Sequence, residues 1–573
     1  MRHNPKTNTT SRKRLGLSAS LLCLAVGCKP SPEPLDARAT CQFALTRCGA
    51  DQAACVPEQI EPHCSSLTVT GSTRIDPERV PVADLLFMIE NTSLSLPIQR
   101  RLVDQSPRLF ERLRSRPLNY HVGVVSSDVG STLYPGHVWD RLGWACNTFA
   151  GDGGTLQSAA CDTRNVTPDA RMACAHLCPD STMVPSDGRP FIAVENGVTN
   201  VPPKLERDGT TGKMVDSGPM KAFRCMALIG DVGCGITGHM EAVRRALLPT
   251  NTANAGFLRP DSILAVVMVT SGDDCSVPLP NRNLNSPNTI NCLEPSSEAS
   301  PLCFTPSETR CLAGAITCDE PMNTSGIKTN CKARANSYLE PTDTYFRFLS
   351  SLRPKHKLAL AGIWPRPALD EGGRLEIEST IPGDSRGLNL SGSTRASCAY
   401  AGDTSVWGNA QIRLSTLARS FGNSKLASRF LEHSACELDS FDSVLTSVVD
   451  SIFLKTHPCV ENQRLGAGSE QPLCLVRDEP REGSKGERSD YYPACSEHCC
   501  QAFSLAKDPQ ATDPQIRASC KEDPTCYCAV ESSVGICDGA SLASVWRPRT
   551  APQPAGTVTR FDCLSSVPPT TDR

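Results

Sequence analysis

Apolar segments of strand length alternate with amphipathic segments of helix length between residues 82 and 453. Val82–Ile89 and Ile263–Val269 are almost uninterrupted apolar runs, as expected for strands buried on both faces of a parallel sheet. Shorter apolar runs predict two further strands at 120–125 and 358–363. Four buried strands spread over nearly 300 residues indicate one large sheet.

The segments between these strands have the spacing of amphipathic helices. In the first of them Ile98, Leu102 and Leu109 recur at near-helical intervals, and Pro107 predicts a kink or break inside it. Further helices are predicted at 238–248, 343–352, 411–421 and 441–453. Strands that alternate with helices predict an α/β fold with a doubly wound, mostly parallel sheet and right-handed crossovers.

Three long stretches interrupt the alternation, at about 130–222, 272–340 and 364–408. All three are rich in Gly, Pro, Ser, Asn and Asp, and each contains cysteine. Loops of this length inside a domain are usually functional or disordered, and crosslinks would give them a fixed shape. From residue 459 onward the strand and helix periods fade while cysteines crowd together. We therefore expect a domain at 81–458 with cystine-stapled insertions, followed by a disulfide-rich region at 459–573.

The N-terminus predicts export. Five basic residues and no acid precede a short apolar run at 15–27, a pattern typical of a signal peptide at 1–27. The run is too short to span a bilayer. It ends Leu-Ala-Val-Gly-Cys, which resembles a bacterial lipobox and implies acylation of Cys28; ordinary secretion with cleavage nearby is the alternative. Lys29 and Pro30 resemble the residues that sort lipoproteins to the outer membrane.

The 30 cysteines support an oxidising compartment. Without Cys23 and Cys28, 30 − 2 leaves 28, an even number that suits full pairing. No C-x-x-C occurs, so cystines are favoured over zinc thiolates. Residues 28–80 combine a Pro-rich tether with a small cystine module. The disulfide candidates are Cys41, Cys48, Cys55, Cys64, Cys225, Cys234, Cys275, Cys436 and Cys459.

Composition and motifs argue against two functional classes. A net charge of −3 with 5% aromatic residues does not suit a nucleic-acid groove. The chain has no G-x-S-x-G elbow and no H-E-x-x-H, so a secreted hydrolase is the least favoured alternative. Among the scattered histidines, His121 is expected to be a structural or sheet-end residue and His239 an exposed residue in a first helical turn.

Several segments together resemble von Willebrand factor A (VWA) domains. DLLFMIENTSLSLPIQRRL is similar to their first strand, metal loop and first helix. NYHVGVVSSD, GCGITGHMEAVRRAL, FLRPDSILAVVMVTSGDDCS and NAQIRLSTLARSFG follow in the family's order. They look most similar to the versions in exported lipoproteins of predatory and social soil bacteria. The resemblance covers roughly 82–455 and implies a Rossmann-like sheet with a ligand site at the carboxyl ends of its strands.

In that family a magnesium ion is held at this site by hydroxyl and acidic groups. Transferred position by position, the resemblance places Glu90, Thr92 and Thr237 among the ligands, with Asp273 nearby. Leu94 stands where the family has a second serine, and Ser271 where it has an aspartate. These departures predict a degenerate site. Either a weak Mg or Ca site survives through Ser93 or Ser95 and a water-linked Asp273, or the polar residues bond only to loop backbones.

The sequence therefore predicts a non-catalytic lipoprotein of the cell envelope. Its VWA-like domain would bind a protein partner whose identity the residues do not give, its N-terminal lipid would contact the membrane, and no cofactor beyond a possible Mg or Ca ion is implied. The alternative is a structural or assembly component of an envelope complex. Fold alone does not decide between them.

Overall fold

The computed structural model describes the greater part of the chain from residue 68 onward. The predicted signal peptide, Cys28, Cys41, Cys48, Cys55, Cys64 and Cys234 lie outside the described residues. Those residues are 68–76, 80–129, 151–207, 212–233, 237–276, 316–322, 324–334, 339–365, 375–381, 390–394, 396–400, 403–421, 430–437, 441–460, 474–481, 484, 488–489, 491–506, 513–530, 537, 541–548 and 552–565.

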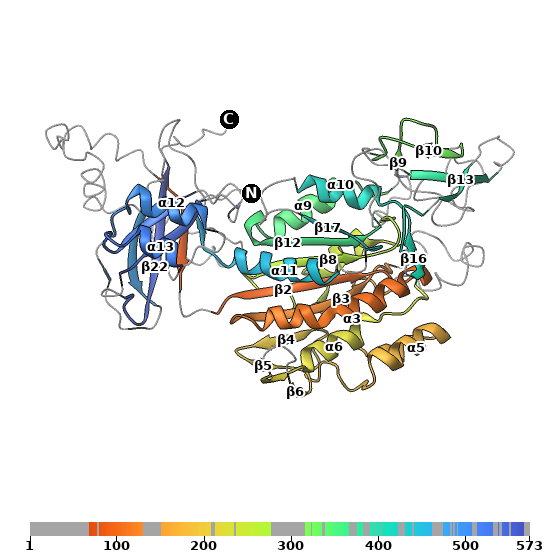
Figure 1. Cartoon of the computed structure of the whole chain (residues 1–573), viewed down its shortest axis with the longest axis horizontal. Coiled ribbons are helices and arrows are strands. Elements are labelled where there is room, and N and C mark those ends of the chain that lie inside the picture. The colour runs from red at the N-terminus through yellow and green to blue at the C-terminus, as the bar shows by residue number, and fades with distance from the viewer. Residues whose placement is uncertain are drawn as a thin grey trace, which may run out of the picture.

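A mixed seven-stranded sheet forms the centre of the fold, in the order β17-β12-β8-β2-β3-β4-β5 (Figure 1). The first five strands of this order run parallel, and β4 and β5 are antiparallel additions at one edge. The strand bounds are β2 Val82–Ile89, β3 Asn119–Ser126, β4 Ile192–Glu195, β5 Val198–Thr199, β8 Ile263–Val269, β12 Leu358–Trp364 and β17 Leu431–Ser434.

Helices cover both faces of this sheet, and each face has its own apolar core. Alternate side chains of β2 enter opposite cores: Phe87 and Ile89 pack with α3, α6 and α11, whereas Leu86 and Met88 pack with α7, α9 and α10. This alternation is the period-2 geometry of a strand buried on both faces. The helix bounds are α3 Leu96–Leu113, α6 Gly218–Ala227, α7 His239–Leu247, α9 Thr342–Leu352, α10 Ile412–Ser420 and α11 Phe441–Lys455.

Helix α3 is continuous through Pro107, so of the predicted kink or break the break does not occur. A proline at this position has no N–H to donate to the carbonyl of Val103, four residues earlier. The Ser106 hydroxyl donates to that carbonyl instead, over 2.7 Å. The helix also buries Leu102, Leu109 and other apolar residues against the sheet. A replacement donor and a buried face together keep the helix intact.

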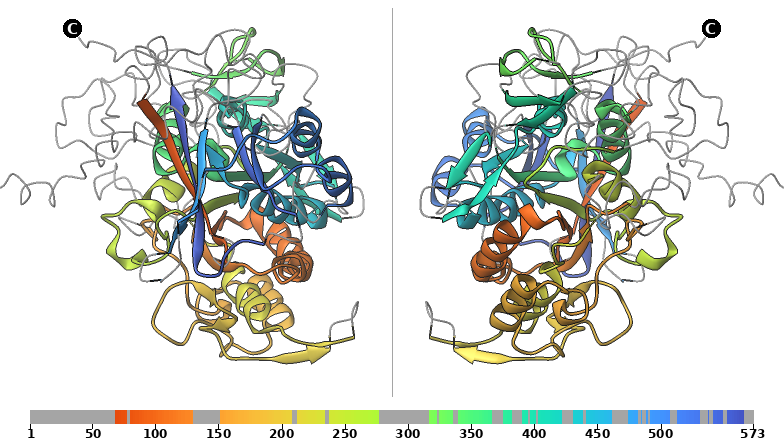
Figure 2. Two further views of the ribbon diagram at one scale, coloured as in Figure 1. Left: turned by 90° about the vertical axis from the view of Figure 1, so that its left-hand side faces the viewer. Right: turned by 90° about the vertical axis from the view of Figure 1, so that its right-hand side faces the viewer.

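The described part of the first insertion, from residue 151 to 222, contains regular elements. It supplies strands β4 and β5 to the main sheet, and its two cystines, Cys161–Cys174 and Cys178–Cys225, tie α5 to η5 and α6. Hairpin β6–β7 projects at the edge of the molecule (Figure 2). The bounds are η5 Cys161–Thr163, α5 Pro168–Leu177, β6 Leu205–Arg207 and β7 Met214–Asp216. The short helix η6 Thr252–Asn254 follows α7.

The second and third insertions combine beside the carboxyl ends of the parallel strands. Strand β10 of the second pairs with β13 of the third, and an apolar cluster that includes Cys275, Cys331 and Ile377 lies beneath them. The elements are β9 Ile316–Thr317, β10 Gly326–Lys328, β11 Lys332–Ala333, β13 Leu375–Ile381, β14 Leu390–Thr394, β15 Cys398–Tyr400 and β16 Asp403–Gly408. The short helix η8 Lys355–Lys357 lies between the two insertions, directly before β12.

The C-terminal region folds around two small antiparallel sheets, one of which includes a strand from before the main domain. Strand β1, within the segment predicted as tether, pairs along β22 near the other end of the chain (Figure 1). Buried cystines link α12 to the end of α13 and to β20 of the second sheet. The elements are β1 Thr68–Ile75, β18 Cys459–Val460, β19 Cys474–Pro480, α12 Glu497–Leu505, α13 Pro514–Ser519, β20 Cys526–Val530, β21 Ser541–Trp546 and β22 Thr557–Ser565.

No helix within the described parts of the chain has both the length and the apolar character needed to cross a bilayer.

Candidate functional site

The loops that follow β2, β3 and β8 meet at the carboxyl ends of the strands. Backbone hydrogen bonds join them: the Glu90 N–H donates to Val269, the Ser127 N–H to Ile89, and the Gly238 N–H to Ser127. Ligands of open α/β sheets usually bind outside this edge. The first polar side chain after β2, Glu90, is therefore the natural starting point.

The Glu90 carboxylate is buried and receives hydrogen bonds from the chain itself. Its Oε2 accepts from the Thr270 hydroxyl at 2.6 Å, from the Ser271 N–H at 2.5 Å and hydroxyl at 2.9 Å, and from the Gly272 N–H at 3.1 Å. The Thr92 hydroxyl donates to Oε1. A carboxylate offers about four lone-pair positions. Four donors therefore converge on Oε2 and one lies on Oε1, all of them supplied by the chain's own loops.

These contacts determine how readily Glu90 binds a proton. Burial on its own raises the pKa of a carboxyl group. The contacts with His239 and the hydroxyls of Thr270 and Thr92 outweigh burial and lower the pKa of Glu90 from 4.5 to about 2. The group is therefore an anion across the neutral and mildly acidic range.

His239 is buried, which corrects the expectation of an exposed residue in a first helical turn. Helix α7 begins at His239, and its first turn is covered by the loop after β8. The imidazole Nε2 lies 2.8 Å from the Thr270 hydroxyl and 3.9 Å from Glu90 Oε2. Its Nδ1 has no hydrogen-bond partner within the described structure. Tertiary contacts with a loop 31 residues away place this side chain inside the protein.

A hydroxyl, an imidazole and a carboxylate lie together here, but not as a hydrolytic triad. In a triad the acid bonds one ring nitrogen and the nucleophile the other. Here Thr270 and Glu90 both lie on the Nε2 side of His239, and the Thr270 hydroxyl donates to Glu90. Thr270 is also completely buried. The arrangement holds three loops together and leaves no accessible nucleophile.

The two acids after β8, Asp273 and Asp274, accept hydrogen bonds from the first N–H groups of two helices. Asp273 accepts from the backbone N–H groups of Ile412, Arg413 and Leu414 at 2.9 to 3.2 Å, which are the first N–H groups of α10. Burial raises the pKa of Asp273, although these donors oppose the shift. Asp274 accepts from the Met240 N–H at 2.9 Å, in the first turn of α7. Each acid supplies an acceptor to a helix N-terminus, as a capping residue does.

The structure brings together only part of the set suggested by the VWA resemblance. Glu90 and Thr92 are in direct contact, whereas the Thr237 hydroxyl donates to the Asp273 backbone carbonyl at 3.3 Å. The Asp273 carboxylate is directed to α10. Ser95, considered as a substitute ligand, donates its hydroxyl to the backbone carbonyl of Glu90 at 2.6 Å. The hydroxyls of Thr270 and Ser271, which do contact the carboxylate, were not predicted as ligands of this group.

The donors and acceptors present do not fit a magnesium site. Magnesium requires near-octahedral oxygen ligands at about 2.0 to 2.1 Å. The lone pairs of Glu90 already accept N–H and O–H donors, and those of Asp273 accept helix N–H groups. Within the described residues, the groupings of three or more His, Cys, Asp or Glu side chains close enough to share a metal ion consist of cysteines alone. Of the two interpretations left open by the sequence, hydrogen bonding to the loops agrees with this geometry.

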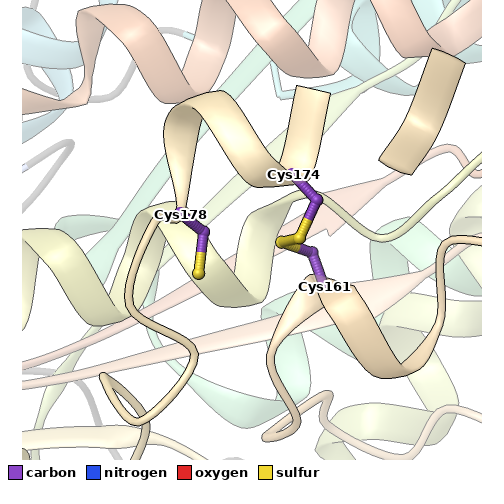
Figure 3. A group of neighbouring side chains, drawn as sticks. All are labelled: Cys161, Cys174 and Cys178. Atoms are coloured by element: carbon purple, nitrogen blue, oxygen red, sulfur yellow. A yellow bond between two sulfur atoms is a disulfide. The ribbon is translucent and has the colours of Figure 1, made fainter. Parts of the chain in front are cut away.

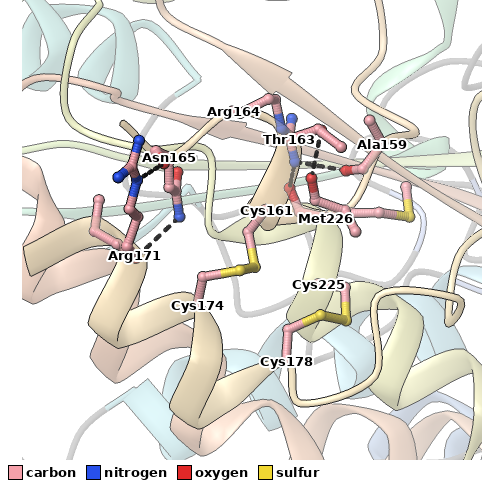
Figure 4. The surroundings of a disulfide bond; sticks show 12 residues. Ala159, Cys161, Thr163, Arg164, Asn165, Arg171, Cys174, Cys178, Cys225 and Met226 are labelled. Atoms are coloured by element: carbon pink, nitrogen blue, oxygen red, sulfur yellow. Dashed lines mark hydrogen bonds between the residues drawn. A yellow bond between two sulfur atoms is a disulfide. The ribbon is translucent and has the colours of Figure 1, made fainter. Parts of the chain in front are cut away.

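The cysteine groupings are cystines. Cys161, Cys174 and Cys178 lie close together on and beside α5, and Figure 3 shows the Cys161–Cys174 bond between two of them. Cys178 is bonded to Cys225, as Figure 4 shows. The side chain of Arg164 donates to the carbonyls of Ala159 and Met226 beside these bonds. A sulfur already in a disulfide is not a thiolate ligand, so these groups staple the first insertion.

The other cysteine candidates from the sequence are also bonded where the structure describes them. Cys436 pairs with Cys398, and Cys459 pairs with Cys537. Cys275 is disulfide-bonded as well. The cystines thus connect the insertions and the C-terminal region to their neighbours.

A second polar cluster, with Asp84 and His121 buried, lies at the opposite, amino-terminal side of the sheet. Arg259 donates to the buried carboxylate of Asp84 at 2.6 Å, and His121 lies 3.0 Å from Glu195 through Nε2. His121 Nδ1 is 2.9 Å from the Phe257 carbonyl. These contacts tie β2, β3 and β4 to the segment before β8. His121 is thus a structural residue at a sheet end, as the sequence predicts.

Comparisons with known proteins give little further guidance. No family model matches the chain, and no curated protein matches it. One similar solved structure is the pilus adhesin RrgA from Streptococcus pneumoniae, with 9% identity and a TM-score of 0.20. The match covers 87% of this chain and 58% of the adhesin, so the chain spans less than two thirds of its length. A likeness this weak carries no argument about fold or function.

Proposed function

We propose that this protein is a non-catalytic, exported lipoprotein of the cell envelope that binds a protein partner. Its sheet domain is a doubly wound, VWA-like platform, anchored through Cys28. The partner contacts surfaces formed by the cystine-bound insertions and does not contact a metal at the strand ends. Assembly into an envelope complex is the second form that such binding could take.

The observation that carries this proposal is the enclosure of Glu90. The acid at the general ligand position of the sheet is 2% exposed and is occupied by donors from the chain's own loops. Its Oε2 accepts four donors of the chain and its Oε1 accepts the Thr92 hydroxyl, so a substrate or a metal would have to displace the chain's own groups. Binding by this domain therefore requires a different surface.

Exposed apolar side chains support the insertions as that surface. Five of the seven large apolar residues that are exposed within the described structure belong to the first insertion. Among them, Leu205 and Met214 are on hairpin β6–β7, which projects from the molecule (Figure 2). The others in this insertion are Val166, Met172 and Val198. Apolar side chains scattered singly over a surface are normal, so the proposed contact surface rests on the pair that the projecting hairpin presents together.

Expression of the full chain with its leader tests both parts of the proposal. Mass spectrometry of the membrane fraction should find an acylated N-terminus at Cys28, and Cys28→Ala should release the protein. Crosslinking in intact cells should capture one stoichiometric partner. The double variant Leu205→Glu/Met214→Glu should lose that partner, whereas Leu505→Glu, a change at a comparably exposed apolar residue of α12, should retain it. Unchanged capture by the double variant would contradict the proposed surface.

A further inference from the structure

Hairpin β15–β16 lies against the carboxyl ends of the strands that carry the enclosed acid. The Asn409 N–H, directly after β16, donates to the Ser271 carbonyl at 3.0 Å. At Gly408 an added Cβ would lie 2.5 Å from the same carbonyl oxygen. The two backbones can approach this closely only because Gly408 has no side chain.

From this contact β16 continues across the end of β2. It packs against η3 (Ser93–Ser95) and against α3, the two elements that follow Glu90. Figure 1 shows β16 beside the ends of the central strands. The hairpin therefore occupies the side of the sheet at which open α/β folds bind their ligands.

Two attachments hold the hairpin in this position. On its C-terminal side, Asp273 accepts from the first N–H groups of α10, which begins four residues after Gly408. On its N-terminal side, Cys398 is opposite Gly408 in the hairpin register and is bonded to Cys436, in the loop after β17. Of these two attachments, only the disulfide is covalent.

This disulfide differs from the others in its exposure. Of the cystines formed between described residues, Cys398–Cys436 is the only one in which both cysteines are partly exposed. Each of the others has at least one buried cysteine. Attack on either sulfur opens a disulfide, so this bond offers two points of attack, whereas Cys318–Cys331 and Cys459–Cys537 each offer one. Exposed disulfides are typically the labile ones.

We propose that hairpin β15–β16 is a cover over the strand-end carboxylate of Glu90, and that reduction of Cys398–Cys436 by a dithiol releases it. A thiolate of the reductant attacks one sulfur of the cystine and forms a mixed disulfide, which its second thiol then resolves. Two cysteine thiols form and the dithiol becomes a disulfide, so that two electrons and two protons pass to the protein. Release exposes the carboxylate and hydroxyl groups at the strand ends. This inference is independent of the envelope location and partner proposed above.

Stepwise reduction of the oxidised full chain with dithiothreitol tests the cover. After alkylation and peptide mapping, Cys398 and Cys436 should be the first thiols labelled among the described cystines. In the same samples, amide hydrogen exchange of peptides spanning 88–96 and 268–274 should become about tenfold faster, as expected for loss of a local cover. Labelling of another described cystine before this one would overturn the proposal, as would unchanged exchange once this bond is open.

Two variants separate the cover from general destabilisation. Gly408→Val keeps the disulfide but places a side chain against Ser271, so it should speed exchange at 88–96 without reductant. Cys318→Ser/Cys331→Ser removes a cystine from the second insertion and should leave that peptide unchanged. Unchanged exchange in Gly408→Val, or equal acceleration in the Cys318/Cys331 variant, would show that the hairpin is not the specific cover.

Discussion

Replacing Glu90 by Gln tests whether the strand-end acid holds the loops together. The amide keeps the size of the side chain but removes its charge. The amide also places an NH₂ group where one carboxylate oxygen now accepts hydrogen bonds. Depending on its orientation, that NH₂ faces either the donors of Thr270 and Ser271 or the Thr92 hydroxyl. A donor facing a donor in a buried site costs the hydrogen bond and leaves both groups unsatisfied.

The loss of stability expected in Glu90→Gln follows from the pKa of Glu90. Glu90 has a pKa of about 2 in the folded protein against an ordinary value of 4.5. At about 1.4 kcal/mol for each tenfold change in proton affinity, the ionised group stabilises the fold by on the order of 3 kcal/mol at pH 7. Because the folded-state pKa is the lower one, this stability is present above pH 4.5 and is lost as the pH falls from 4.5 toward 2.

Thermal unfolding of the wild type and Glu90→Gln at pH 7 and pH 3 measures this contribution. The variant should lose roughly 5–10 °C in Tm at pH 7, and the difference should shrink at pH 3. Glu437→Gln is the matched control, because that side chain is 66% exposed and should change stability by no more than about 0.5 kcal/mol. A Glu90→Gln variant as stable as the control at pH 7 would refute the role assigned to this carboxylate.

Substitutions at three further places test other parts of the structure. Asp273→Ala should lower the free energy of unfolding, measured by chemical denaturation, by about 1–2 kcal/mol because α10 loses its capping acceptor. Asp273→Asn should lower it less, because one oxygen remains and the buried charge is gone. Equal decreases in the two variants would contradict this role. Arg259→Met leaves the buried Asp84 carboxylate without its cation and should cost about 3–5 kcal/mol; a loss under about 1 kcal/mol would contradict the pair. Cys459→Ser/Cys537→Ser removes a disulfide that spans 78 residues and should destabilise the C-terminal region by about 2–5 kcal/mol. Proteolysis after residue 459 should become faster, and an unchanged rate would contradict this.

The central strands could be predicted from the sequence because burial on both faces requires long apolar runs. Val82–Ile89 and Ile263–Val269 agree with the structure at both ends. Strands β4, β5 and β17 were not predicted. They are two to four residues long and lie toward the edges of the sheet, where partial exposure allows polar residues such as Glu195 and His433. Such short segments leave no periodic signal.

The candidate site was predictable in position but not in its contacts. Apolar runs followed by polar loops place Glu90 and the Asp273 loop at one edge of the sheet, as in the structure. The partners of Asp273 are backbone N–H groups about 140 residues away, and local capping patterns cannot reveal an acceptor supplied from that distance. The burial of His239 has the same cause, since a loop distant in sequence covers it.

Calorimetric titration of the full oxidised chain with magnesium, calcium and manganese tests most directly whether the strand-end carboxylate is held by the chain's own donors. The hydrogen bonds at Glu90 predict no saturable heat with any of the three ions at neutral pH and no rise in Tm on their addition. Stoichiometric binding of one ion that stabilises the protein and disappears in Glu90→Gln, but persists in Glu437→Gln, would contradict this structure of the site.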